Sequence, residues 1–305
     1  NIVKNKKNVF IVDNLSSGFK KLISKKVKFY KLNILNTKKL KKIIVKNKID
    51  SIIHLAGSLI ISAGEKNPKK YYQNNVIGTQ SVMNACKNTS VKNFIFSSTA
   101  AVYKDNQKIV HEKSKIMPKS VYGKTKIKAE KLIISNCNKS KINYSILRYF
   151  NVFGASLSGK IGPIARTDSL FKNISVEITK KKPNINIYGN DYNTKDGTTI
   201  RDYIHVSDLA EAHYKILKNI YKTNKSTIIN CGYHRGISVK EVVGEFKKQS
   251  KKKINIFYQK RRLGDLAIVI ANNKKLKKTI KWNPKYFKLG TIVKSCISWE
   301  KRINR

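Results

Sequence analysis

Apolar and polar positions along the first half of the chain alternate in blocks that predict strands and helices in turn. The predicted strands are short runs of β-branched and aromatic residues at 8–14, 49–57, 91–99 and 142–154. The predicted helices have apolar residues at helical spacing and cover 37–47, 74–87 and 120–136. Because strands that alternate with helices are typical of βαβ units, we predict an α/β fold with a Rossmann-like, doubly wound parallel sheet.

The pattern loosens beyond the last of these strands. Residues 155–200 are rich in Gly, Pro, Asn and Asp, which favour loops around short elements, and a clear helical pattern returns at 207–220. We therefore predict two domains. The sheet domain covers 1–154, and a smaller C-terminal α/β domain covers 155–305, with parts such as 201–220 returning to the first.

The first residues lack the expected opening of a dinucleotide-binding sheet, which is a strand, a glycine-rich turn and a helix that holds a pyrophosphate. Residues 1–14, NIVKNKKNVFIVDN, contain none of the three and no initiating Met. We expect the chain to begin near the end of the first helix, with on the order of 20 residues of strand, turn and helix outside it. Such a chain is expected to bind a dinucleotide poorly.

The charge of the chain is strongly positive, because 65 Lys and Arg residues stand against 17 Asp and Glu and give a formal net charge of +48. A charge of this size suits a polyanionic partner. Only 8 of the basic residues are arginines, however, and Arg is the side chain that forks onto bases and phosphates. The lysines are spread over the whole length, so we interpret them as solvated surface and expect no specific nucleic-acid partner.

Neither a membrane nor a metal ion is expected. No apolar run reaches the roughly 18–20 residues of a membrane span, and the first residues do not resemble a signal peptide. The four cysteines have neither CxxC nor Cys/His spacing, and they lie far apart at Cys86, Cys137, Cys231 and Cys296. They are expected to be buried thiols in a reducing, cytoplasmic environment.

The stretch SVYGKTKIKAE, residues 120–130, carries the clearest chemical signal. Tyr122 and Lys126 are one helical turn apart and share a face. A phenol is a poor base at pH 7, and lowering its pKa by about three units takes roughly 4 kcal/mol, which a partly buried lysine and a cationic nicotinamide can supply together. YxxxK alone is common on surface helices. Here it follows a strand that ends in Ser97-Ser98-Thr99, so the pattern predicts a general base acting on an alcohol.

Three further positions at the ends of elements are weaker candidates. Asp13, at the end of the first strand, suits the ribose hydroxyls of adenosine and favours NAD over NADP, although a turn cap explains it equally well. HLAG, residues 54–57, either lets a cofactor approach closely or simply packs a strand end. Asn74 and Asn75 either bind a ligand or, more simply, cap the following helix.

Seven stretches together resemble the extended short-chain dehydrogenase/reductase family and, within it, the UDP-glucose 4-epimerases. They are VDNLSSG (12–18), YYQNNVIGTQSVM (71–83), VKNFIFSSTAAVY (91–103), VYGKTK (121–126), LRYFNVFGA (147–155), IYGNDYNTKDGTTIRDYIHVSDLA (187–210) and RRLGDLA (261–267). The resemblance covers nearly the whole chain, and the segment 187–210 is especially specific to these epimerases. It implies that the first predicted domain binds NAD and that the second mainly binds the UDP-sugar.

The resemblance also implies a role for individual residues. Tyr122 would be the catalytic base, Lys126 would bind the nicotinamide ribose and lower the phenol pKa, and Thr99 would bind the sugar hydroxyl. The residues that would bind NAD are Asp13, Asn14, Leu55, Ala56, Gly57, Asn74, Ser97, Tyr122, Lys126 and Phe150. The residues that would bind the UDP-sugar are Thr99, Tyr122, Asn151, Tyr188, Arg201, Arg262 and Asp265, with the arginines on the diphosphate.

The implied reaction is a reversible hydride transfer from sugar C4 to NAD⁺. The 4-keto sugar would then rotate, and the hydride would return to its other face, which interconverts UDP-galactose and UDP-glucose. Family members are usually homodimers paired through helices that correspond to 74–87 and 120–136.

Three alternatives remain open at this stage. Val269 stands where some of these epimerases carry a bulky tyrosine, so the protein is also a candidate UDP-N-acetylglucosamine 4-epimerase. Related 4,6-dehydratases and decarboxylating enzymes need acids after the strand-end threonine, whereas this chain has Ala100 and Ala101. A degenerate, non-catalytic basic binding protein is favoured by the charge and by the absent glycine-rich turn.

Overall fold

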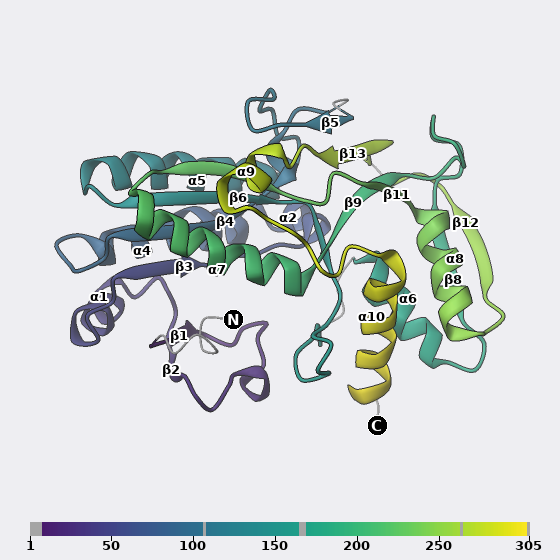
Figure 1. Ribbon diagram of the computed structural model, residues 1–305, viewed down its shortest axis with the longest axis horizontal. Helices are drawn as coiled ribbons and strands as arrows, with labels where there is room; N and C mark the ends of the chain where they lie inside the picture. Colours follow the sequence, from purple (N-terminus) through teal and green to yellow (C-terminus); the bar gives the residue numbers. More distant parts are fainter. Residues whose placement is uncertain (1–7, 106–107, 165–168, 263–264, 304–305) are drawn as a thin grey trace. The chain divides into compact units, whose positions relative to one another are not determined.

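The computed structural model describes residues 8–105, 108–164, 169–262 and 265–303 (Figure 1). The chain divides into two compact units. The first unit contains Asn1–Tyr103, Ile116–Tyr149 and Glu211–Ile229, and the second contains Lys104–Lys115, Phe150–Ala210 and Asn230–Arg305. Each unit has its own buried apolar cluster.

The strands of the first unit confirm the predicted α/β class with parallel pairing. One group is the parallel pair β1 (Phe10–Asp13) and β2 (Lys28–Lys31). The other group is a four-stranded sheet in the order β10-β6-β4-β3, formed by β3 (Ser51–His54), β4 (Asn93–Thr99), β6 (Asn143–Tyr149) and β10 (Thr227–Cys231). The central strand β4 runs parallel to both β3 and β6.

The described strands of this sheet are in two hydrogen-bonded groups and not in one continuous sheet.

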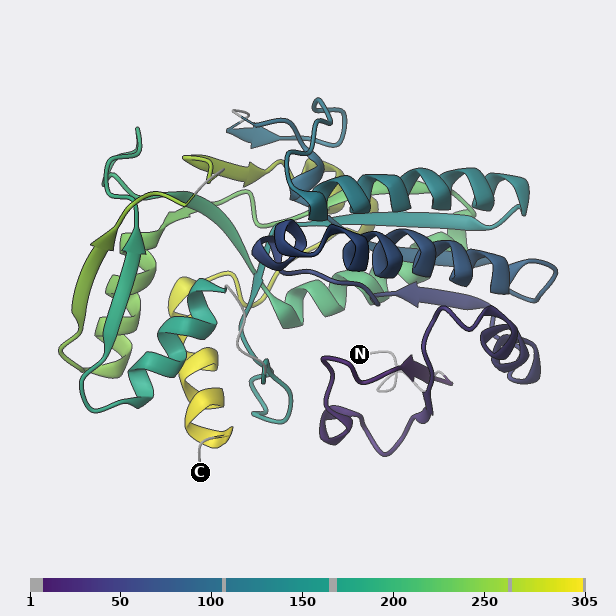
Figure 2. The same cartoon turned by 180° about the vertical axis from the view of Figure 1, so that it is seen from behind.

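Helices cover both faces of the four-stranded sheet (Figures 1 and 2). The helices with residues in the first unit are α1 (Thr37–Lys46), α2 (Ile61–Lys66), α3 (Pro68–Tyr72), α4 (Gly78–Cys86), α5 (Val121–Lys139) and α7 (Val206–Thr223). α4 and α5 pack together on one face, and α5 contacts β4 and β6. α7 lies on the other face, where the Tyr149 hydroxyl is 2.5 Å from His213 Nε2.

Local sequence explains why the two elements that carry the YxxxK motif form where they do. β4 is buried on both faces along Asn93–Ser98, as its nearly continuous apolar run predicts for a central parallel strand. α5 begins after Ser120, whose hydroxyl oxygen accepts a hydrogen bond from the Gly123 N–H at 3.1 Å. The apolar face of α5 packs on β4 through Ala129 and Ile133, which are fully buried.

The second unit is also a mixed α/β structure. Its larger sheet has the order β11-β9-β13-β5, with β7 paired to β9, and consists of β5 (Ile109–Val110), β7 (Asn151–Phe153), β9 (Ile200–His205), β11 (Gly236–Ser238) and β13 (Ile268–Ala271). β8 (Asn184–Tyr188) and β12 (Asn255–Gln259) form a separate parallel pair. The helices are α6 (Leu170–Thr179), α8 (Val239–Ser250), α9 (Lys274–Ile280) and α10 (Leu289–Ile303). α6, α8 and α10 pack around Phe171, Phe246 and Ile292.

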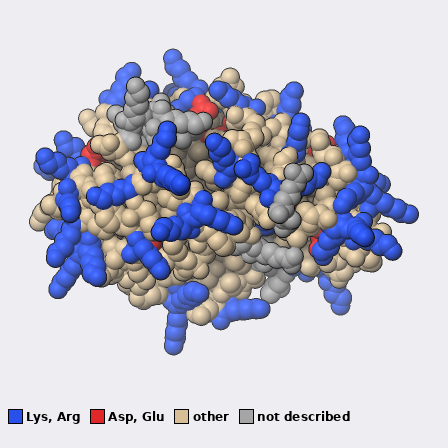
Figure 3. Space-filling view, turned by 90° about the horizontal axis from the view of Figure 1, so that it is seen from below, with Lys and Arg blue, Asp and Glu red and all other residues tan. Residues whose placement is uncertain are grey.

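Lysine and arginine side chains are scattered across the face shown in Figure 3, with few acidic side chains between them. On this face they do not gather over one element, which agrees with the interpretation of the lysines as solvated surface. Among the helices that the structure describes, none is both long and apolar enough to cross a membrane.

Candidate active site

The end of β4 and the first turn of α5 bring two of the predicted catalytic side chains together. Thr99 is the last residue of β4, and its side-chain oxygen accepts a hydrogen bond from the Ala101 N–H at 3.2 Å. Tyr122 lies in the first turn of α5 and is half-buried. The Thr99 side chain lies close enough to the phenol of Tyr122 to lower its pKa by hydrogen bonding. The phenol therefore meets a hydroxyl at the carboxyl edge of the sheet, as the strand-end pattern predicted.

Lys126 lies one turn further along α5 and is almost fully buried, with 5% of its surface exposed. Its Nζ atom lies 4.4 Å from the centre of the Phe96 ring on β4. Burial lowers the pKa of Lys126 to about 8, and the charge of Glu130 acts in the opposite direction. The ammonium is therefore held in an apolar, aromatic environment in which its charge is costly.

The phenol of Tyr122 is not activated by the protein alone. Burial raises its pKa above the ordinary value, the hydrogen bond with Thr99 lowers it, and the nearby Tyr71 raises it. Lys126 is not among these causes. The predicted lowering of the phenol pKa by Lys126 therefore does not arise in the protein by itself, and a further positive charge is required to produce it.

The end of β1 carries Asp13 and Asn14, both exposed. Asp13 Oδ1 accepts a hydrogen bond from the Leu15 N–H at 2.7 Å, and Asn14 Oδ1 accepts one from the Ser16 N–H at 3.0 Å. These bonds stabilise a turn in which Leu15 has a φ of 59°. The turn-capping explanation of Asp13 is thus realised, and one carboxylate oxygen lies over Gly18, where an added Cβ would approach it to 3.3 Å.

The loop after β3 contains the predicted cofactor-binding run Leu55-Ala56-Gly57, and all three residues are exposed. A Cβ on Gly57 would come within 2.8 Å of Asn75 Oδ1, so this position has no room for a side chain. Ser97, the remaining predicted contact on β4, is 9% exposed. The run is therefore open to a ligand, while a buried side-chain amide packs against its backbone.

That amide belongs to Asn75, whose role sequence reasoning missed. Asn75 Oδ1 accepts a hydrogen bond from the Ser58 N–H at 2.7 Å, and its Nδ2 donates to Thr125 Oγ1 at 3.0 Å. Asn74 Nδ2 donates to Ser58 Oγ at 2.9 Å. Both asparagines lie inside a π-helical turn, Gln73–Ile77, so the prediction that they cap a helix is wrong. π-helical turns are rare overall, but those that occur are often at functional sites. Through Asn75, this turn connects the loop after β3 to α5 by hydrogen bonds.

In the second unit, four of the residues predicted for the UDP-sugar form two pairs. Arg201 on β9 forms an ion pair with Asp265, with 3.3 Å between Nη2 and Oδ1. The guanidinium of Arg262 lies 4.1 Å above the ring of Tyr188, at the end of β8. Val269 on β13 is the register partner of Arg201, so the position predicted to select the sugar is next to an arginine predicted to bind the diphosphate.

Two more predicted residues lie at the start of the second unit, directly after the end of β6. Phe150 is buried, and its N–H donates to the Cys231 carbonyl at 3.2 Å. Asn151 Nδ2 donates to the Asp202 carbonyl at 3.2 Å. Asp202 itself is fully buried, and its carboxylate accepts hydrogen bonds from the backbone N–H groups of Tyr233, His234 and Ala271. The sequence showed no sign that Asp202 organises these loops.

Several of the residues predicted to bind NAD lie at strand ends of the first unit. The strand ends of β1, β3 and β4 offer the carboxylate of Asp13, the open run that ends at Gly57, and the pair formed by Thr99 and Tyr122. These groups suit the adenosine ribose, a closely approaching cofactor backbone and the nicotinamide end. The printed sequence has no GxxGxxG pattern to hold a pyrophosphate. In the described residues, no three His, Cys, Asp or Glu side chains gather as a metal site would.

Comparison with known proteins agrees with this geometry. The sequence pattern of the NAD dependent epimerase/dehydratase family matches residues 1–232. A UDP-glucose 4-epimerase of Lactobacillus helveticus is 36% identical over 302 residues, which cover 98% of this chain and 92% of that protein.

Solved structures give the same result. The UDP-Glc/GlcNAc 4-epimerase of Campylobacter jejuni superimposes with a TM-score of 0.85 at 35% identity, covering 99% of this chain and 94% of that one. A UDP-glucose 4-epimerase of Bifidobacterium longum, in complex with NAD⁺ and UDP, superimposes with a TM-score of 0.91 at 28% identity, covering 99% of this chain and 93% of that one.

Proposed function

This chain belongs to the NAD dependent epimerase/dehydratase family, and we propose that it catalyses the 4-epimerisation of a UDP-hexose, interconverting UDP-galactose and UDP-glucose. The observation that carries the proposal is that Thr99 at the end of β4 interacts with Tyr122 in the first turn of α5, with Lys126 buried one turn further along the same helix. An epimerase needs one base beside the reacting hydroxyl and no second acid. Ala100 and Ala101, in the turn after Thr99, supply no such acid.

Each residue of the first unit has a defined task in this reaction. Tyr122 takes the proton from the sugar 4-hydroxyl and later returns it, and Thr99 shares that proton through its hydrogen bond. Lys126 holds the ribose at the nicotinamide end and keeps a positive charge near the phenol. NAD⁺, when bound, supplies a hydride acceptor and the extra positive charge that the phenol requires. Asp13, Asn14 and the run Leu55–Gly57 hold the adenosine end and the cofactor backbone.

The residues of the second unit hold the nucleotide and leave the sugar free to turn. Arg201 and Arg262 bind the diphosphate oxygens, for which charge-assisted hydrogen bonds are the strongest option. Asp265, Tyr188 and Asn151 complete the uridine and sugar contacts. Because the anchoring groups bind the UDP part, the oxidised sugar can rotate and present its other face to the same base.

Two features of the wider protein belong to the proposal. The protein acts in the cytoplasm, which is supported by four buried cysteines that form no disulfide. It forms a homodimer through α4 and α5, which is supported by the exposed apolar side chains of Tyr72 and Ile77 beside these helices, 43% and 39% exposed. Light scattering should give the mass of a dimer, and Ile77→Glu should reduce it to that of a monomer. A monomeric wild-type protein would contradict the dimer.

The decisive experiment is to supply the purified protein with NAD⁺ and UDP-galactose and to measure UDP-glucose formation. Because this chain is expected to bind a dinucleotide poorly, we expect turnover by the wild-type protein only once it is saturated with NAD⁺, and a loss of several orders of magnitude in Tyr122→Phe, with UDP affinity largely unchanged. Near-normal turnover in that variant would refute the assignment of the base. Absence of turnover in wild-type protein that has bound both NAD⁺ and UDP would refute the function.

A second candidate substrate is favoured by Val269. Valine leaves more room beside the sugar than tyrosine does, which suits a 2-acetamido group, and the similar Campylobacter jejuni protein is described as a UDP-Glc/GlcNAc 4-epimerase. We expect the protein to turn over UDP-N-acetylglucosamine as well and Val269→Tyr to lose this activity while retaining UDP-glucose turnover. A wild-type enzyme that epimerises UDP-glucose and leaves UDP-N-acetylglucosamine untouched would exclude this candidate.

A further inference from the structure

A buried ion pair lies behind the predicted catalytic residues of the first unit. Glu130 on α5 and Arg148 on β6 have 1% and 2% of their surfaces exposed. Two hydrogen bonds join them in the bidentate geometry, with 3.0 Å between Arg148 Nε and Glu130 Oε1 and 2.7 Å between Nη2 and Oε2. A buried pair of this kind is strongly held, because removal of either partner leaves an uncompensated charge.

The pair holds the chain on both sides of Thr99. Ser98, which directly precedes Thr99, donates its hydroxyl to Glu130 Oε1 and is the register partner of Arg148 across β4 and β6. Tyr103, which follows the turn after Thr99, accepts a hydrogen bond from Arg148 Nη1 at 3.1 Å. The segment that presents Thr99 to Tyr122 is thus fastened at its two ends to one buried ion pair.

The same carboxylate acts on Lys126. Glu130 follows Lys126 by one helical turn, and its charge raises the pKa that burial lowers to about 8. Two other groups that face Lys126 carry no negative charge. Phe96 presents its ring from β4, and His54, at the end of β3, is kept neutral because burial and the charge of Lys126 lower its pKa to about 3.

We propose that Glu130 and Arg148 are positioning residues for this site, which hold Thr99 against Tyr122 and place a carboxylate one helical turn from Lys126. The proposal deepens the proposed function, because Thr99, Tyr122 and Lys126 are the residues that it serves. Neither member of the pair needs to contact substrate or cofactor. Both act through residues that do.

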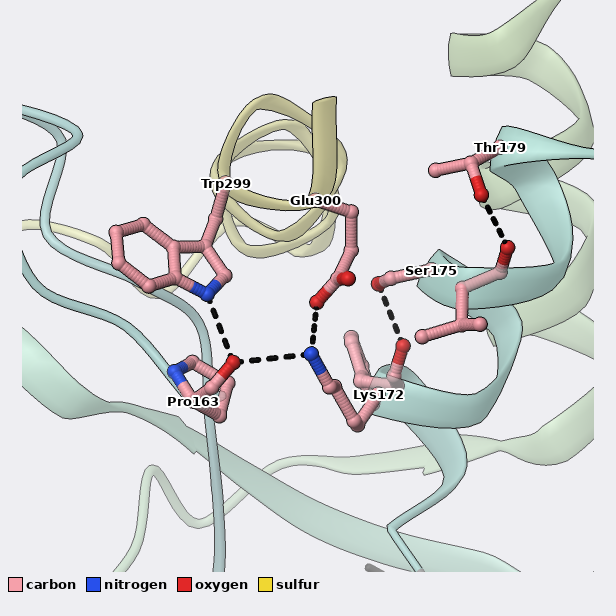
Figure 4. Close-up of polar contacts among 8 residues, drawn as sticks. Pro163, Lys172, Ser175, Thr179, Trp299 and Glu300 are labelled. Atoms are coloured by element: carbon pink, nitrogen blue, oxygen red, sulfur yellow. Dashed lines mark hydrogen bonds and ion pairs between the residues drawn. The ribbon is translucent and has the colours of Figure 1, made fainter. Parts of the chain in front are cut away.

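The competing explanation is that the pair only stabilises the fold, and the second unit offers a matched control for it. Lys172 on α6 and Glu300 on α10 form an equally buried ion pair, with 5% and 2% of their surfaces exposed (Figure 4). Lys172 Nζ also donates to the Pro163 carbonyl at 3.0 Å, which accepts a second bond from Trp299 Nε1 at 2.7 Å. Breaking either pair should lower the stability of the fold. Only breaking the Glu130–Arg148 pair should change the titration midpoint of Lys126.

The primary test is an NMR titration of ¹³Cε-labelled lysine in the protein without cofactor, with Lys126 assigned by Lys126→Met. We expect Glu130→Gln to lower the titration midpoint of Lys126 by roughly one pH unit. Glu300→Gln should leave that midpoint unchanged. The double variant Glu130→Gln/Arg148→Met should show a smaller shift in the same direction, because the loss of the Arg148 charge acts in the opposite sense, and it serves as the folded variant if Glu130→Gln alone is unstable.

Ser98→Ala tests the link to Thr99 with the loss of a single hydrogen bond. We expect its kcat to fall about tenfold with an unchanged KM and an unchanged Lys126 midpoint. The proposal is overturned if Glu130→Gln and the double variant leave the Lys126 midpoint unchanged, if Glu300→Gln shifts it equally, or if Ser98→Ala has wild-type kcat. If no UDP-hexose were turned over while Lys126 titrated as expected, the proposed function would fail and the control of Lys126 by Glu130 would stand.

Discussion

The side chain of Thr99, the last residue of β4, lowers the pKa of the Tyr122 phenol in the first turn of α5 by hydrogen bonding. This bond opposes the effect of burial, because it lowers a phenol pKa that burial raises. The hydroxyl of Thr99 is itself oriented by the Ala101 N–H at 3.2 Å. The threonine is therefore a fixed partner for the phenol and not a freely turning surface residue.

Thr99→Val should raise the pKa of Tyr122 further and slow turnover, because it removes the hydroxyl but keeps the branched shape. We expect kcat to fall roughly 10-fold to 100-fold, the range for a hydrogen bond to a charged group. Thr99→Ser is the matched control and should retain most of the activity. Tyrosine ¹³Cζ NMR, with Tyr122→Phe for assignment, measures the pKa. A wild-type phenol pKa in Thr99→Val would contradict this account.

Residues in one local pattern could be predicted from the sequence. The strand ending at Thr99, the helix at 120–136 and the YxxxK spacing are each encoded within a few residues, so the meeting of Thr99 and Tyr122 followed from the βαβ order. The residues predicted for UDP binding came from the resemblance alone. No periodicity relates Tyr188 to Arg262, which stack across two elements.

The residues that sequence reasoning missed depend on contacts between distant segments. Asn75 was interpreted as a cap because a π-helical turn has no simple sequence signature. Glu130 stands one helical turn after Lys126, a spacing that the sequence does show. Its burial and its pairing with Arg148 depend on the packing of α5 against β6, which the helical pattern alone does not specify.

The buried charge of Lys126 should make stability depend on pH. Its pKa is about 8 in the folded protein against 10.5 as the ordinary value, so between these values the unfolded chain binds more protons and stability rises with pH. Lys126→Met should therefore be more stable than wild type at pH 7, by up to about 3 kcal/mol, and this advantage should disappear near pH 10.5. Urea unfolding of both proteins from pH 7 to pH 10.5 measures the difference. A constant difference across this range would show that Lys126 titrates normally.

Two glycines in helices should respond to alanine in opposite ways. A Cβ on Gly123, next to Tyr122, would lie 2.4 Å from the Ala101 carbonyl oxygen and 2.9 Å from Pro118 Cβ, so Gly123→Ala must push α5 away from the turn after Thr99. A Cβ on Gly244 in α8 would meet nothing within 4 Å. We expect Gly123→Ala to lower the melting temperature and the activity, and Gly244→Ala to stabilise the fold by about 0.5–1 kcal/mol. Thermal melting measures both, and an unaffected Gly123→Ala would contradict the close approach.

Substitution of two neighbouring arginines should distinguish a side chain that binds UDP from one that only makes local structural contacts. Arg262 and Arg261 both lie over tyrosine rings, at 4.1 Å from Tyr188 and 4.3 Å from Tyr192. Arg261 is already paired with Asp191, with 2.7 Å between Nε and Oδ1, whereas Arg262 is predicted to bind the diphosphate. Arg262→Ala should weaken UDP binding by about 1.5–3 kcal/mol, the range for hydrogen bonds to charged groups, and Arg261→Ala should weaken it far less. Isothermal titration with UDP compares them, and because the lost contact is ionic, the gap between the two variants should narrow as salt is added. Equal losses in both variants would mean that neither arginine is specific for the diphosphate.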